Sequence, residues 1–152
     1  TPRRAVVGWD GGRLAMVLAV LEARAGVHFS SNDVYLNVAG GLRITEPAAD
    51  LAVAAALLSS LTGRPVPAGS VVFGEIGLSG EVRPVTQAET RLKEAGKLGF
   101  ERALTPPLRR AAAAQSGSLE LSEIADLPAL ASMFRDEARP APRRGMARGA
   151  EH

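Results

Sequence analysis

Cysteine is absent from this chain of 152 residues. Its absence excludes a disulfide framework and any cysteine-based zinc site, and it suits a reducing compartment. No apolar run reaches the roughly 18 residues that a membrane-spanning helix needs, because Asp50 and Thr62-Gly63 bound the longest one. His28 is the only histidine before the terminal residue and no ligands cluster, so we expect no metal site. Aromatic residues make up 4%, and no row of them offers a stacking surface for nucleic-acid bases.

Basic charge is concentrated at the C-terminal end. Residues 137–152 hold four arginines against two glutamates, whereas basic and acidic side chains balance in the rest of the chain. This segment is rich in arginine and proline and has little to bury, so we expect a disordered tail over 137–152 and a single domain over 1–136. The first residue is Thr1, and no signal-peptide pattern follows, so we expect a piece of a longer protein.

Periodicity and turn residues predict a mixed α/β fold. Helices are expected where apolar residues recur at helical spacing, over 13–25, 47–62, 87–98 and 127–134. Short runs rich in β-branched residues predict strands over 4–9, 27–29, 33–38, 70–76, 81–85, 102–104 and 118–121. We interpret 27–29 with 33–38 as one hairpin and 70–76 with 81–85 as a second. The glycines of Asp10-Gly11-Gly12 are expected in a turn.

Five blocks of sequence occur in a fixed order. They are Arg13-Leu14-Ala15, Tyr35 to Gly41, Glu46 to Ala52, Gly74 to Glu81, and Lys97-Leu98-Gly99-Phe100. Together they resemble the Lon proteolytic domain over residues 5–135, and most of all the C-terminal Lon-like domain of the RadA (Sms) family of bacterial DNA-repair proteins. The resemblance implies a mixed α/β (α+β) fold similar to the second domain of ribosomal protein S5.

The resemblance also locates two missing catalytic groups. Lon-type proteases use a serine nucleophile and a lysine, and Ala48 and Glu89 stand at the matching positions. A methyl group cannot attack a carbonyl, and a carboxylate cannot replace the amine of a Ser–Lys dyad. We therefore expect no catalytic residue and no enzyme activity in this chain. An active serine protease would need a nucleophile that we do not find.

In the RadA family this domain follows a zinc-finger segment and a RecA-like ATPase. The chain contains no G-x-x-x-x-G-K-S/T phosphate-binding loop. We therefore expect ATP and zinc only in other parts of the parent protein, and no cofactor here. The resemblance implies a homo-oligomer, a hexameric ring, that binds double-stranded or branched DNA during recombinational repair and branch migration. It also implies recombinase partners through the parent, and a cytoplasmic, nucleoid-associated location without membrane contact.

Arginines are the candidate DNA contacts, because guanidinium groups suit phosphate oxygens. We expect Arg43 and Arg83 to flank the groove around Ala48, and Arg13 to contribute from the first helix. Contacts should be to the backbone, since no helix that reads bases can be identified. The alternative is that these arginines form salt bridges at subunit interfaces or on a solvated face. A second alternative for the whole domain is a protein–protein docking platform that uses the former protease groove without binding DNA.

Carboxylates also surround the vacated site. Glu46, Asp50 and Glu89 could lie near one another in a Lon-like fold. We interpret them as residues at helix N-termini, where the helix dipole favours negative charge.

Overall fold

The first unit of the fold is a parallel β–α–β motif. The computed structural model describes residues 2–135. In it β1 (Arg4–Val7) pairs in parallel with β2 (Val34–Asn37), and α1 (Gly11–Ala25) connects them. The Asp10 side chain accepts a hydrogen bond from the Arg13 N–H at 2.9 Å and so caps α1. Gly26, with a φ of 65°, ends the helix in the left-handed conformation.

Two local predictions are wrong in this unit. Residues 27–29 form no strand, and β2 pairs with β1 rather than with a hairpin partner. Gly11 and Gly12 are helical, because Asp10 starts α1 before them rather than opening a turn. A parallel pair requires a long crossover, which α1 supplies.

The second half of the chain builds a parallel sheet around a buried helix. A short 3-10 helix (Pro47–Ala49) leads into α2 (Asp50–Thr62), and Gly63 ends α2 as expected. The sheet has the order β3-β6-β7, formed by β3 (Ser70–Val72), β6 (Arg102–Thr105) and β7 (Glu120–Glu123), all parallel. Helix α3 (Ala88–Lys97) lies between β3 and β6 in sequence, α4 (Arg110–Ala113) precedes β7, and α5 (Leu127–Ser132) follows it.

The second predicted hairpin is confirmed in a shorter form. β4 (Glu75–Ile76) and β5 (Val82–Arg83) pair antiparallel around the Gly77–Gly80 turn. The preceding residues 70–72 belong to the parallel sheet instead. Two further 3-10 helices, Ala39–Gly41 and Ala114–Ser116, lie in loops.

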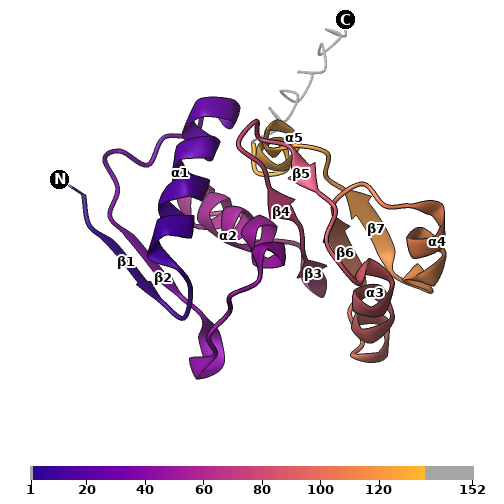
Figure 1. The fold of residues 1–152 in the computed structure, drawn as a ribbon. Helices are drawn as coiled ribbons and strands as arrows, with labels where there is room; N and C mark the ends of the chain where they lie inside the picture. The colour runs from indigo at the N-terminus through magenta and orange to yellow at the C-terminus, as the bar shows by residue number, and fades with distance from the viewer. Residues whose placement is uncertain (1, 136–152) are drawn as a thin grey trace, which may run out of the picture.

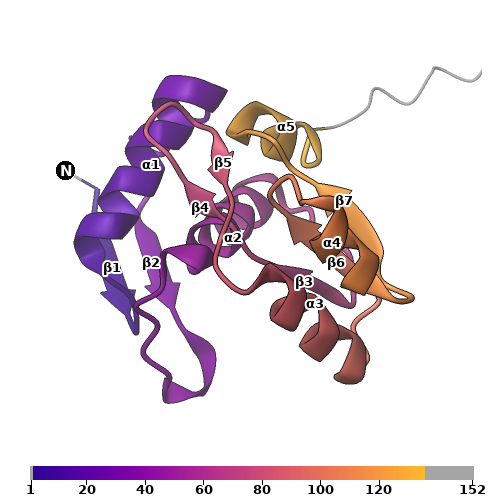
Figure 2. The same cartoon turned by 45° about the vertical axis from the view of Figure 1, so that its right-hand side comes forward.

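Two apolar clusters hold these elements together. The larger joins α1, α2 and α5 with the β4–β5 hairpin, around the fully buried Leu14, Leu51 and Leu127. The smaller packs Leu92 and Ala95 of α3 against Ala103 of the sheet. Figure 1 and Figure 2 show α2 between the β1–β2 pair and the β3-β6-β7 sheet. The predicted α/β class is therefore confirmed, with parallel sheets.

Two predictions fall at the limits of this structure. The expected disordered tail over 137–152 lies outside the described residues, and so does the end of the expected domain at residue 136. Within residues 2–135, no helix combines the length and apolar character needed to cross a membrane.

Candidate functional site

Ala48 lies buried in the short 3-10 helix before α2, beside a surface pocket of about 450 Å³. Two backbone hydrogen bonds hold its loop against the chain before β4: Gly74 N–H donates to the Ala48 carbonyl at 2.9 Å, and Leu51 N–H donates to the Gly74 carbonyl at 3.0 Å. Arg43, Glu46 and Arg91 line the same pocket. Thr45 is the one hydroxyl in its lining, and the described lining residues include no histidine or lysine.

Glu89 faces a different pocket. It lies in the first turn of α3 and lines a pocket of about 540 Å³, together with Pro84 and Arg109. It is not among the residues that line the Ala48 pocket. The positions matching the two halves of the Lon dyad therefore open onto separate pockets.

The three carboxylates expected around the vacated site lie in different surroundings. Glu46 accepts a hydrogen bond from Arg91 at 2.7 Å. Asp50 is fully buried and pairs with Arg13, while Glu89 lines the other pocket. The structure does not gather them into one acidic cluster.

Arg13 forms a two-point ion pair with Asp50. Its Nε and Nη2 donate to the two carboxylate oxygens at 2.5 Å each, and its side chain is 27% exposed. The Ile76 N–H donates to the same carboxylate at 3.0 Å, so the pair ties α1 to α2 and β4. The hydrogen bond with Asp50 is the main cause that raises the pKa of Arg13. The pair gives Arg13 a structural role, whereas its predicted contact with DNA stays a prediction.

Arg83 lies on β5 and is 54% exposed. Its Nε and Nη2 both reach Oε1 of Glu81 at 2.9 Å. The pKa of the Glu81 carboxyl is lowered, first by its own backbone N–H and then by the guanidinium of Arg83. Arg83 does not line the Ala48 pocket, so the expected groove shared with Arg43 is not seen in that form.

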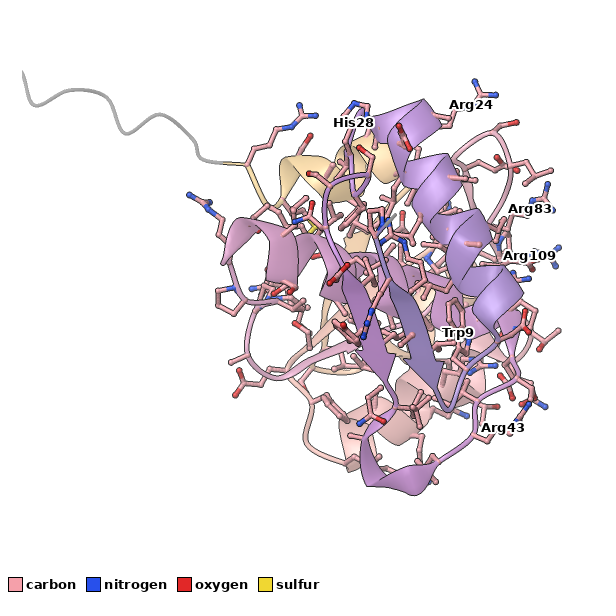
Figure 3. The ribbon with its side chains drawn as sticks, turned by 90° about the vertical axis from the view of Figure 1, so that its left-hand side faces the viewer. Trp9, Arg24, His28, Arg43, Arg83 and Arg109 are labelled. Atoms are coloured by element: carbon pink, nitrogen blue, oxygen red, sulfur yellow. The ribbon has the colours of Figure 1, made fainter. Side chains whose placement is uncertain are left out.

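Arg43 is exposed at the rim of the Ala48 pocket and forms no ion pair with any described residue. In Figure 3 the labelled side chains of Arg24, Arg43, Arg83 and Arg109 project from one edge of the molecule, at the right of the view. The sequence analysis does not point to Arg24 or Arg109 as DNA contacts. No local pattern marks them, because only the packing of distant elements places them on this edge.

Metal ligands do not gather in the described part of the chain. Residues 2–135 contain no group of three or more histidine, cysteine, aspartate or glutamate side chains arranged to hold an ion. The expectation of a metal-free domain thus stays a prediction.

Comparison with known proteins decides the family. The family model described as "Subunit ChlI of Mg-chelatase" matches residues 13–108, which is more than half of the chain. This chain belongs to that family. The match spans both vacated positions, Ala48 and Glu89. The description names the family as a whole and assigns no chelatase activity to this chain.

Similar curated proteins include DNA repair proteins RadA from several bacteria. The protein from Brucella abortus (strain 2308) is 69% identical over 106 residues, which are 70% of this chain and 23% of that protein. The protein from Pseudomonas aeruginosa is 56% identical over 105 residues, 69% of this chain and 23% of that protein. The one from Synechocystis is 56% identical over 106 residues, 70% and 21% of the two chains. The resemblance to RadA is thereby confirmed, and this chain spans about a quarter of the length of the relatives it matches.

Proposed function

We propose that this chain is a non-proteolytic, Lon-like module that assembles into a ring and binds duplex DNA for a RadA-type repair protein. The observation that carries the proposal is the exposed Arg43 at the rim of the Ala48 pocket, which contains no nucleophile paired with a base. The RadA relatives support a role in DNA repair. The β4–β5 hairpin and the loop before α2 support a fold similar to the Lon domain and to the second domain of ribosomal protein S5.

The lack of proteolysis follows from the chemistry of the Ala48 pocket. A covalent mechanism needs a nucleophile within hydrogen-bond reach of a base. Thr45 supplies a hydroxyl, but the guanidinium groups of Arg43 and Arg91 cannot accept its proton. Glu46 is already held by Arg91. The Ala48 pocket thus offers no activated nucleophile.

Electrostatics support binding to the DNA backbone. Arg43 has no carboxylate partner among the described residues, so no existing pair must break before it contacts a phosphate. The pair of Arg83 with Glu81 is partly exposed, with the side chain of Arg83 54% and that of Glu81 39% exposed, and ion pairs open to solvent contribute little to stability. Both guanidinium groups can therefore exchange their surroundings for phosphate oxygens at low cost.

A hexameric ring would repeat these contacts around one duplex. Several large apolar side chains are exposed in the isolated chain, among them Leu42, Leu78 and Leu98. Neighbouring subunits in a ring could cover them. In this proposal ATP and zinc are bound by other parts of the parent protein. Branch migration and contacts with recombinases also belong to that parent, in the cytoplasm at the nucleoid.

The first prediction concerns Arg43→Ala and Arg83→Ala. In the assembled protein each should weaken duplex binding and lower the dependence of log K on log salt by about 0.9 for each phosphate that the variant no longer neutralises. Fluorescence anisotropy with a labelled duplex at several salt concentrations measures both quantities. Affinity and slope that stay at wild-type values for both variants would remove these arginines from the interface.

The Ala48 pocket favours a second candidate, a docking platform for a peptide or a partner protein. A pocket of about 450 Å³ that retains charged Arg43, Glu46 and Arg91 could hold a short segment without cutting it. The mass of the protein in solution, with and without duplex, separates the two candidates. Hexamers that bind DNA support the ring module, and monomers without DNA affinity support docking.

A further inference from the structure

The β4–β5 hairpin lies between two arginines that come from other elements. On one side, the side chain of Arg24 in the last turn of α1 packs on the hairpin turn: a Cβ added at Gly80 would lie 2.8 Å from the Cβ of Arg24. On the other side, Pro84, which follows Arg83, lines one pocket with Arg109. Arg24 and Arg109 therefore come from elements on the two sides of the hairpin that carries Arg83, although the three residues are far apart in sequence.

These arginines differ in how they are paired. Arg24 and Arg109 form no hydrogen bond or ion pair with any described residue through their guanidinium groups. Arg83 is bound only to Glu81, which is partly buried. Glu123 accepts the Leu108 N–H at 3.2 Å but forms no ion pair with Arg109. Two of the three guanidinium groups are thus available for an external anion.

Backbone hydrogen bonds fix the hairpin that carries Arg83. Gly77 N–H donates to the Glu81 carbonyl at 2.9 Å within the turn. From outside, Leu127 N–H donates to the Gly80 carbonyl at 2.8 Å, and Val82 N–H donates to the Ala125 carbonyl at 2.9 Å. These bonds fix the turn against the start of α5. Positions fixed in this way reduce the entropy cost when a ligand binds.

We propose that Arg24, Arg83 and Arg109 form one track that binds the phosphate backbone of duplex DNA, with the β4–β5 hairpin lying along the strand. Arg24 and Arg109 are new contact residues in this proposal, which rests on the DNA binding proposed above. Arginine suits the role because its planar guanidinium binds two phosphate oxygens at once. Figure 3 shows the three side chains directed outward from the same edge. The track reads no bases, because contacts to phosphates position a duplex without reporting its sequence.

The test uses Arg24→Ala and Arg109→Ala in the full protein, with Arg3→Ala as the matched control. Arg3 is exposed and directly precedes β1, and the β1–β2 pair faces the viewer in Figure 3, away from the edge that carries the track. All three variants remove one positive charge from the surface. Loss of one arginine–phosphate contact reduces the slope of log K against log salt by about 0.9. The ratio of wild-type to variant affinity for duplex should therefore be about eight-fold larger at 0.1 M salt than at 1 M salt.

We expect both track variants to show these changes in duplex binding while Arg3→Ala keeps wild-type values. Track variants that match Arg3→Ala, with the wild type still binding duplex, would overturn the track and leave the proposed function intact. A wild type that binds no duplex would instead overturn the proposed function. Polyglutamate that competes as well as unlabelled duplex would show a surface for acidic proteins and would also overturn the track.

Discussion

At the scale of single residues, the pair of Arg13 and Asp50 decides how the helices meet. Asp50 is fully buried, and a buried carboxylate is costly unless it is paired and hydrogen-bonded. Arg13 and the Ile76 N–H supply the partners. The sequence suggested Arg13 as a DNA contact because nothing near it in the chain shows that Asp50 is buried beside it. Its charge is visible in the sequence, but its partner depends on the fold.

We predict that Arg13→Ala lowers the free energy of unfolding by about 3 kcal/mol, because it leaves Asp50 buried without its cation. Arg13→Ala combined with Asp50→Ala should cost less than the two single changes added together, since the two side chains interact directly. Urea unfolding followed by circular dichroism measures these values.

Arg43→Ala is the control for this prediction, because Arg43 is exposed and lacks an ion pair among the described residues. Its effect should stay within about 0.5 kcal/mol. If Arg13→Ala costs no more than Arg43→Ala, the pair does not hold the helices together.

At the scale of elements, the sequence predicts most helices well and strand pairing poorly. Helix α2 was expected over 47–62 from its apolar run, its proline and the glycine after it, and the structure has it nearly so. The predicted partner of β2 is wrong, because the sequence of a short strand does not indicate which other strand it pairs with. The pairing depends on α1 carrying the chain back over the sheet. The β4–β5 hairpin was recoverable because its turn glycines are local.

Gly80 illustrates a local requirement set by a distant element. Its φ of +83° favours glycine, and a Cβ there would meet Arg24 of α1. We predict that Gly80→Ala lowers the free energy of unfolding by about 1–3 kcal/mol, owing to strain and the displaced Arg24 stem.

The matched control is Gly96→Ala, inside α3, where an added Cβ meets nothing within 4 Å. This change should raise stability by up to about 1 kcal/mol, because alanine favours helix more than glycine does. Thermal or urea unfolding of both variants checks the opposite signs. A neutral Gly80→Ala would mean that the turn tolerates a side chain and that Arg24 is not fixed by it.

At the scale of the whole molecule, the two positions that match the Lon dyad lie at different pockets of an α/β domain. The sequence located both vacated positions, Ala48 and Glu89, and the family match covers them both. It could not show that these side chains open onto different pockets, since that depends on how α3 packs on the sheet. Likewise, only some of the candidate DNA contacts could be predicted from the sequence. Arg43 and Arg83 lie near recognisable motifs, whereas Arg24 and Arg109 become candidates only because of how the elements pack.

The separation of the two pockets predicts the outcome of restoring the dyad. Ala48→Ser combined with Glu89→Lys puts back both functional groups of a Lon-type protease. A nucleophile and its base must come within about 2.6–3.2 Å of each other. Because positions 48 and 89 line different pockets, we expect no hydrolysis of casein or of a fluorogenic peptide above the wild-type level.

Ala52→Ser is the control for the restored dyad, because Ala52 lines the Ala48 pocket and the change adds a hydroxyl there without a partner. Hydrolysis by the double variant, with none by Ala52→Ser, would show that the two positions can still meet when a substrate binds. In that case the side chains at positions 48 and 89 alone would account for the lack of proteolysis that we propose. Inactivity of both variants would agree with the separation of the two pockets, which depends on how α3 packs on the sheet.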